Sequence, residues 1–310
     1  MRSFFKKSFD TFLIFGFAVF ILLDSFLIPH AYTSVSAEAA STQSSSSDTS
    51  GTASVSSSSS ASSTEATVTD TSYQDDNVSI TITTDRYEDT TIYVADVQIS
   101  SIDYLKTALA SGTYGRNITA TTSSIADSVN AILAINGDYY GARNSGYVMR
   151  NGTLYRTTSS GSDQIDLAIN ADGSFSFYNE GTTDASSITN ALQIFSFGPS
   201  LIENGTITVD ENSEVGKAMA SKPRTAICEI EPLHYLFVVA DGRTTESQGL
   251  SLYQMAQYLS TLGVTNAYNL DGGGSSTMVF MGNVINKPTT SGNSIKERAV
   301  RGIIYIGESL

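Results

Sequence analysis

The sequence contains few of the residues that usually carry metal, redox or basic chemistry. It has one cysteine, two histidines and no tryptophan in 310 residues. Cys228 has no partner for a disulfide within the chain, and a zinc site of cysteine and histidine would lack ligands. Lys and Arg number 17 against 31 Asp and Glu, which gives a formal net charge of −14. So acidic a chain cannot present the basic stripe that tracks nucleic-acid phosphates, so nucleic acid is not an expected partner.

The N-terminus has the pattern of an export signal. Cations at positions 2, 6 and 7 precede an apolar run from Phe12 to Leu23, which is expected to be helical. Two interpretations of residues 1–37 stay open. They form either a signal peptide cleaved after Ala37 or an uncleaved signal anchor, a transmembrane helix that would make the membrane a partner. Both interpretations place the rest of the chain outside the cytoplasm.

A serine-rich segment follows. Serine accounts for 14 of the 24 residues from Ser41 to Thr64, and no aromatic residue interrupts them. This composition cannot bury enough apolar surface to offset the entropy lost on ordering. We therefore predict a disordered Ser/Thr-rich linker over residues 38–76 and a single catalytic domain over residues 77–310.

The domain contains more strand signals than helix signals. Alternation of apolar and polar residues predicts strands over 78–84 and 91–100, and an apolar run predicts another over 131–135. Dipeptides that favour tight hairpin turns separate further strands. These dipeptides are Asn151-Gly152, Asp172-Gly173, Asn204-Gly205 and Gly282-Asn283.

Three helices are expected between these strands. They cover residues 101–109, 124–129 and 251–262, and Ser251 and Gln254 form a capping box at the start of the last one. The combination predicts an α+β fold with a central mixed or antiparallel sheet, hairpins and a few helices.

Four polar motifs lie at the ends of expected strands. They are Asn136-Gly137-Asp138, Pro223-Arg224-Thr225-Ala226, Asp241-Gly242-Arg243 and the run from Asn269 to Met278. The last run contains Gly272, Gly273 and Gly274, followed by Ser275 and Ser276. Consecutive glycines let the backbone approach a ligand closely, and their N–H groups then bind an anion. Each motif taken alone is also compatible with an ordinary polar turn.

Together the motifs supply three carboxylates, two guanidiniums and a glycine-rich turn. Carboxylates perform acid–base or nucleophilic chemistry where histidine is scarce. Guanidiniums and backbone N–H groups bind phosphate. The set indicates a phosphorylated sugar, although a nucleotide or a carboxylated ligand would use the same groups.

The order of these motifs, with Phe197-Gly198-Pro199 between the first two, resembles the phosphodiester glycosidase family. The similarity extends from about Ile135 to Met278. It implies a hydrolase that cleaves the C1–O bond of a sugar-1-phosphodiester, for example an N-acetylglucosamine-1-phosphodiester. The export signal and the serine-rich segment place this hydrolase outside the cytoplasm and suggest an envelope glycopolymer or exopolysaccharide as the substrate. The sequence itself requires no cofactor, and a Ca²⁺ or Mg²⁺ ion held by oxygen ligands stays open.

The resemblance also implies roles for individual residues. The candidates for nucleophile or base are Asp271 and Asp241, with Asp138 as a third. Arg224 and Arg243 are assigned to the phosphate, and the remaining groups to phosphate or sugar oxygens. These remaining groups are Asn136, Gly272, Gly273, Gly274, Ser275 and Ser276. Arg298 and Arg301 match the family's arginine-containing last strand only loosely and receive no role.

Two other functions stay open. A surface module could bind an anionic glycopolymer with the same groups and cleave nothing. A phosphodiesterase could cleave the P–O bond instead and release sugar-1-phosphate. The products of turnover distinguish the three functions.

Overall fold

The computed structural model describes residues 65–213, 222–290 and 294–308. The expected signal segment, with its apolar helix, and the serine-rich segment up to Thr64 lie outside these residues. Among the helices that are described, none is long and apolar enough to cross a membrane.

The largest sheet has nine strands in the order β1-β2-β3-β4-β15-β14-β16-β12-β13. Its first two strands lie within residues 65–76, and β2 pairs with β3. Tyr73 of β2 is buried, so the folded domain already includes this part of the expected linker. The strands are β1 (Thr67–Val68), β2 (Ser72–Gln74), β3 (Val78–Tyr87), β4 (Thr90–Ile99), β12 (Ser200–Glu203), β13 (Thr206–Ile207), β14 (Arg224–Glu231), β15 (His234–Ala240) and β16 (Asn266–Asn269).

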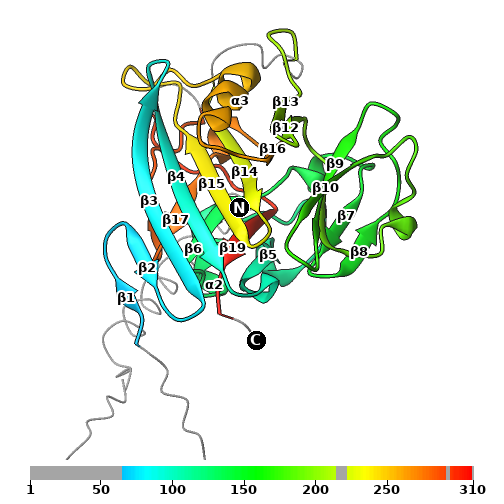
Figure 1. Ribbon diagram of the computed structural model, residues 1–310, viewed down its shortest axis with the longest axis horizontal. Helices are drawn as coiled ribbons and strands as arrows, with labels where there is room; N and C mark the ends of the chain where they lie inside the picture. The colour runs from blue at the N-terminus through cyan, green and yellow to red at the C-terminus, as the bar shows by residue number, and fades with distance from the viewer. Residues whose placement is uncertain (1–64, 214–221, 291–293, 309–310) are drawn as a thin grey trace, which may run out of the picture. The chain divides into compact units, whose positions relative to one another are not determined.

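Two further sheets have five strands each, and Figure 1 shows one of them, β7 to β11, to one side of the large sheet. Its order is β10-β9-β11-β7-β8, and that of the other sheet is β18-β17-β6-β19-β5. The strands are β5 (Leu105–Leu109), β6 (Leu133–Asn136), β7 (Val148–Arg150), β8 (Thr153–Arg156), β9 (Ile165–Asn170), β10 (Phe175–Asn179), β11 (Ala191–Phe195), β17 (Met278–Phe280), β18 (Asn283–Val284) and β19 (Gly302–Ile306). The first three dipeptides expected to form tight turns join hairpin partners, which confirms those predictions; the fourth hairpin, β17–β18, turns one residue earlier, at Met281-Gly282, because Asn283 already pairs with Phe280.

The expected α+β fold is wrong, because the described residues form three antiparallel sheets with only two α-helices, α2 (Thr122–Ser128) and α3 (Leu252–Ser260). The helix expected over 101–109 is instead a single 3₁₀ turn followed by β5, since β5 pairs with β19 along its whole length. The capping box of Ser251 and Gln254 at the start of α3 is confirmed. The short 3₁₀ turns are η1 (Ile102–Tyr104), η2 (Ala110–Gly112), η3 (Tyr140–Ala142), η4 (Ala185–Ser187) and η6 (Gly273–Ser275).

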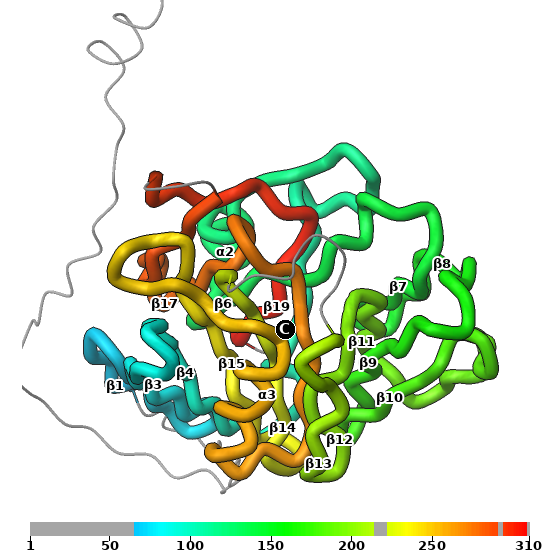
Figure 2. Tube along the Cα trace, turned by 90° about the horizontal axis from the view of Figure 1, so that it is seen from above, coloured from blue at the N-terminus to red at the C-terminus, as the bar shows by residue number. Residues whose placement is uncertain are grey.

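One apolar core joins the three sheets. It combines Phe237 from the large sheet with Ile135 and Leu167 from the two smaller ones. On the opposite face of the large sheet, α3 packs against β12, β13 and β16, and its apolar residues share a second cluster with β14 and β15 that includes Cys228 as a buried packing residue. Figure 2 shows the order of the large sheet from β3 and β4 to β12 and β13, with β7 to β10 beyond them. The strand ends that carry the sequence motifs lie where the sheets meet.

Candidate active site

The side chain of Asn136 links two sheets at the site. Its Oδ1 accepts hydrogen bonds from the Thr225 hydroxyl of β14 (2.8 Å) and from the Thr277 N–H (3.2 Å). Its Nδ2 donates to the carbonyl of Asp271 at 2.6 Å, and the Asp271 N–H donates to the carbonyl of Gly137 at 3.3 Å. Asn136 is fully buried. Its amide, expected to bind the substrate, therefore fixes the position of the Asp271 backbone instead.

A pocket of about 230 Å³ opens beside Asp271. It gathers four cationic side chains around one carboxylate, although the chain as a whole is acidic. Such a concentration of positive charge suits an anionic ligand. The lining residues are Phe197, Lys222, Arg224, Arg243, Asn269, Leu270, Asp271, Gly272, Gly273 and Arg298.

Asp271 follows β16 and is 8% exposed. Its Oδ2 accepts hydrogen bonds from the Ser275 hydroxyl at 2.6 Å and from Nη2 of Arg298 at 2.9 Å. Burial is the main influence on this carboxyl and raises its pKa; Arg298 and Ser275 oppose the rise, and Asp138 adds to it. In the part of the chain that the structure describes, no hydrogen bond reaches Oδ1 of Asp271. That oxygen is therefore available to a ligand in the pocket.

Asp138 is a second buried carboxylate close to Asp271. It follows β6, is 4% exposed, and accepts a 2.6 Å hydrogen bond at Oδ1 from Nη2 of Arg150. Arg150 is itself buried and also donates to the carbonyls of Met149 and Ile194. The Oδ2 atom of Asp138 is buried without a hydrogen-bond partner among the described residues. The arginine thus fixes one carboxylate oxygen and leaves the other unpaired.

Asp241, the remaining candidate, does not line the pocket. It is 2% exposed, and its Oδ1 accepts hydrogen bonds from Nδ2 of Asn286 and from the N–H of Lys287, both at 3.0 Å. Burial raises its pKa, and these two donors oppose the rise. Its carboxylate therefore anchors the segment around Asn286 to the end of β15.

The two predicted arginines both line the pocket. Arg224 begins β14, and its Nε donates to the carbonyl of Leu250 at 2.8 Å. Arg243 has a positive φ of 62°, and its Nη1 donates to the carbonyls of Thr289 (3.2 Å) and Thr290 (2.5 Å). Burial and the nearby Arg298 lower the pKa of Arg243. Both guanidiniums are thus held by backbone carbonyls at the pocket wall.

Arg298 is a pocket residue that the sequence analysis missed. Its Nη2 donates to Oδ2 of Asp271, to the Ser275 hydroxyl (2.7 Å) and to the Gly272 carbonyl (3.1 Å), and its Nε donates to the same hydroxyl at 2.9 Å. The side chain is 40% exposed. The sequence signal for it was its place just before the last strand, within the loose match to the family's arginine-containing end.

The glycine run packs mainly against the protein itself. A Cβ atom at Gly274 would collide with the Thr290 side chain, and one at Gly273, where φ is +63°, would lie 3.0 Å from Nη2 of Arg243. The N–H groups of Gly273, Ser275 and Ser276 donate to backbone carbonyls, so these three are already used. Close approach to neighbouring segments therefore accounts for the glycines without a ligand.

Across residues 65–213, 222–290 and 294–308, no group of three or more His, Cys, Asp or Glu side chains is placed to hold a metal ion.

Comparison with known proteins places this arrangement in a family. The chain is 31% identical over 186 residues to the Homo sapiens N-acetylglucosamine-1-phosphodiester alpha-N-acetylglucosaminidase and 30% identical over 186 residues to the Mus musculus protein. Each match covers 55% of this chain and 36% of the relative. The SPbeta prophage-derived uncharacterized protein YomE of Bacillus subtilis (strain 168) is 28% identical over 181 residues, which cover 56% of this chain and 28% of YomE. The chain thus spans about a third of the length of these relatives.

Solved structures share the fold. The zebrafish N-acetylglucosamine-1-phosphodiester alpha-N-acetylglucosaminidase catalytic domain, auto-inhibited by its pro-peptide, aligns with a TM-score of 0.59 at 22% identity over 74% of this chain and 83% of that one. A hypothetical protein from Synechocystis aligns with a TM-score of 0.56 at 16% identity over 74% of this chain and 62% of that one. The model of the phosphodiester glycosidase family matches residues 129–307. Since this match covers more than half of the sequence and contains the motifs at the pocket, the protein belongs to the phosphodiester glycosidase family of hydrolases.

Proposed function

We infer that the protein is an extracytoplasmic hydrolase that cleaves the C1–O bond of a sugar-1-phosphodiester, such as an N-acetylglucosamine-1-phosphodiester, in an envelope glycopolymer or exopolysaccharide. The observation that carries this proposal is the pocket in which Asp271 lies among four cationic side chains. The names of the mammalian relatives support the choice of substrate. Cations facing the phosphate stabilise the negative charge that it gains as the bond breaks.

The proposed reaction consumes one water molecule. The water oxygen bonds to C1, the C1–O bond breaks, and its electron pair stays on the phosphate oxygen, which gives free sugar and a phosphomonoester. In this proposal Asp271 acts through Oδ1 at C1. As a base it takes a proton from water, and as a nucleophile it forms a glycosyl ester that water then hydrolyses. A phosphomonoester is a weak base, so the leaving group needs little protonation.

The remaining pocket residues have supporting roles in this proposal. Arg224, Arg243 and Lys222 bind the phosphate, and Arg298 orients Asp271 through their shared hydrogen bond. Asp138 is the second carboxylate; it lies close enough to raise the pKa of Asp271, and its Oδ2 is buried without a hydrogen-bond partner among the described residues. Asp241 keeps the neighbouring segment in place and does not touch the substrate.

The location outside the cytoplasm is proposed from the cationic and apolar N-terminus. Mass spectrometry of the protein purified from cells distinguishes the two interpretations of residues 1–37. A mature chain that begins near Glu38 supports cleavage, and an intact chain in the membrane fraction supports the signal anchor.

Product analysis in ¹⁸O-labelled water tests the reaction. The full chain is incubated with an N-acetylglucosamine-1-phosphodiester, with and without a chelator. Free N-acetylglucosamine carrying ¹⁸O, together with an unlabelled phosphomonoester, supports C1–O cleavage. Sugar-1-phosphate with ¹⁸O on phosphorus would establish a phosphodiesterase instead. Binding of the glycopolymer without any release would establish a non-catalytic module, and loss of turnover with chelator would establish a required cation.

A further inference from the structure

Two exposed tyrosines lie near the candidate active site. Tyr139 is 39% exposed and Tyr155 is 40% exposed; no other aromatic side chain in the described residues is as exposed. The exposed part of an aromatic ring is apolar surface against which the C–H groups of a sugar ring can pack. The Tyr139 ring centroid lies 6.0 Å from Cζ of Arg298, which lines the Asp271 pocket, so this ring lies close to the pocket.

A guanidinium is fixed over Tyr139. The Cζ atom of Arg301 lies 4.6 Å from the ring centroid, and Nε of Arg301 donates to the carbonyl of Arg116 at 3.0 Å. The side chain packs against Gly141, where any Cβ atom would collide with it. No carboxylate pairs with Arg301 within the described part of the chain. Its two terminal nitrogens are therefore held in place and available to an anion.

Arg298, which lines the Asp271 pocket, lies between Asp271 and the Tyr139 ring that Arg301 also contacts. Its Cζ lies 6.0 Å from the same Tyr139 ring, while its Nη2 reaches Asp271. Arg116, whose backbone carbonyl accepts the hydrogen bond from Arg301, is also exposed. Positive charge thus continues from the pocket across Tyr139 to the surface, although the chain carries a net charge of −14.

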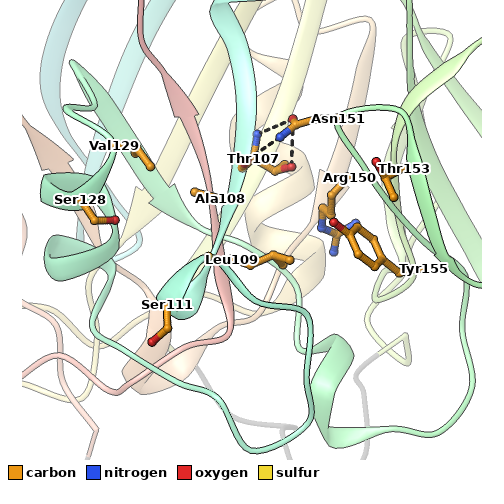
Figure 3. A pocket seen from close by; sticks show the side chains of 11 residues that line it. Thr107, Ala108, Leu109, Ser111, Ser128, Val129, Arg150, Asn151, Thr153 and Tyr155 are labelled. Atoms are coloured by element: carbon orange, nitrogen blue, oxygen red, sulfur yellow. Dashed lines mark hydrogen bonds between the residues drawn. The ribbon is translucent and has the colours of Figure 1, made fainter.

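Stacked rings extend the same surface away from the pocket. Tyr114 stacks on Tyr155 at 4.8 Å and on Tyr140 at 5.1 Å between ring centroids, and it lies two residues before Arg116. Tyr155 lines a second pocket of about 490 Å³. Figure 3 shows Tyr155 and Arg150 of the β7–β8 hairpin on one side of this pocket, with Ser111 and Ser128 across from them.

The second pocket has the composition of a sugar site. Its polar side chains are hydroxyls, one amide and the Arg150 guanidinium, and no carboxylate lines it. Asn151 is braced against Thr107 by hydrogen bonds through its Oδ1 and Nδ2, as Figure 3 shows, which keeps this wall rigid. Hydroxyl and amide groups beside an exposed ring recognise neutral sugar units.

We propose that Tyr139, Arg301, Arg116, Tyr114 and Tyr155 form a tyrosine–arginine strip that binds the part of a polymer next to the cleaved bond. The ligand class is a chain of repeated sugar-phosphate units. Its sugars stack on Tyr139 and Tyr155, a second phosphate binds Arg301 and Arg116, and the chain continues into the second pocket. This inference rests on the proposed function, because it places the scissile phosphodiester in the pocket of Asp271.

The test compares two probes with the full chain. One is the methyl phosphodiester of N-acetylglucosamine, which has a single scissile bond. The other is a synthetic tetramer of N-acetylglucosamine-1-phosphate repeats, with rates expressed per cleavable bond. We expect kcat/KM to be about tenfold higher for the tetramer, since one charge-assisted contact is sufficient for such a factor. The preference should decline with salt, because the second phosphate is bound electrostatically at the surface.

Variants of strip residues test whether the strip causes the higher kcat/KM for the tetramer. Tyr155→Ala and Arg301→Gln should each reduce the ratio of the two kcat/KM values toward one, mainly through KM for the tetramer. Tyr155→Phe, which keeps the stacking face, should retain the ratio. The matched control is Arg86→Gln, which removes one exposed cation from β3 and should leave both probes unaffected.

The outcomes separate the two proposals. If the wild-type protein cleaves both probes equally well per bond, or if the ratio survives Tyr155→Ala and Arg301→Gln, the strip is refuted and the proposed function stands. If the protein cleaves neither probe, the proposed function fails. Calorimetric titration with the tetramer then decides the strip: binding that Tyr155→Ala abolishes supports it, and binding that this change leaves intact refutes it.

Discussion

Asp271 and Asp241 have similar surroundings in the sequence but different surroundings in the fold. Each follows a strand of the large sheet and precedes a glycine, each is buried, and burial raises the pKa of each. Asp271 lines the pocket and shares a hydrogen bond with Arg298, whereas the carboxylate of Asp241 accepts hydrogen bonds from Asn286 and Lys287. Burial and a raised pKa therefore do not distinguish the two carboxylates; access to the pocket does, and it is the reason for proposing Asp271 as the reacting group.

The largest expected effect comes from Asp271→Asn. Removing the charge that we propose acts at C1 should lower kcat by about 10³-fold or more. Asn still offers an oxygen to the Ser275 hydroxyl, so the fold should survive. Sugar release from the phosphodiester measures kcat, and circular dichroism with a thermal melt checks folding. A folded variant within tenfold of wild-type activity would exclude Asp271 from the chemical step.

Arg298→Gln should have the next largest effect, about 10- to 100-fold on kcat. Arg298 lowers the pKa of Asp271, so its removal raises that pKa. If Asp271 works as a carboxylate, activity rises with pH as it ionises, and the acidic limb of the pH–rate profile moves to higher pH in the variant. Arg298→Lys keeps the positive charge, so its kcat and the position of its acidic limb should lie between those of wild type and Arg298→Gln. If the acidic limb of Arg298→Gln lies at the same pH as that of wild type, Arg298 does not influence the ionisation of Asp271.

Sequence patterns found the strand ends because those signals are local. The motifs at residues 224 and 271 lie where strands meet the pocket, the motif at residue 136 is hydrogen-bonded to Asp271, and the hairpin turns follow from dipeptide preferences. What brings the motifs together is not local. The hydrogen bond from Asn136 to Asp271 spans 135 residues. The sequence around an amide at a strand end does not show whether that amide bonds to a ligand or to another part of the chain.

The errors in the sequence analysis have the same origin. The apolar positions of residues 102–109 fit a helical face, yet pairing with β19 makes residues 105–109 a strand, because tertiary hydrogen bonds outweigh a weak local preference. Arg298 precedes the last strand without a recognisable motif, and only the packing of its loop against Gly274 brings it to Asp271. Both outcomes depend on contacts between distant segments.

Changes at Asp241 should affect stability more than activity. Asp241→Asn keeps an acceptor oxygen for Asn286 and Lys287 and should leave kcat within about threefold of wild type. Asp241→Ala leaves these buried donors without an acceptor and should cost about 1–3 kcal/mol of unfolding free energy. Chemical denaturation and sugar release measured on both variants test this difference. A loss of activity in the asparagine variant as large as that of Asp271→Asn would remove the distinction between the two aspartates.

Asp166→Asn on β9 should have the smallest effect on activity. It tests whether a buried carboxylate with a raised pKa matters for catalysis when it lies outside the pocket. Asp166 is fully buried and does not line the Asp271 pocket; burial, with the neighbouring Glu180 carboxylate, raises its pKa from 3.8 to about 9. The folded state thus keeps a proton that the unfolded chain loses, so the contribution of Asp166 to stability is complete below pH 4 and declines as the pH rises toward 9. Asp166→Asn cannot ionise, so its stability relative to wild type should increase between pH 5 and about pH 9 by a few kcal/mol, while kcat stays within about twofold. Denaturation curves across this range measure the trend, and a constant difference between the two proteins would show that Asp166 ionises normally in the fold.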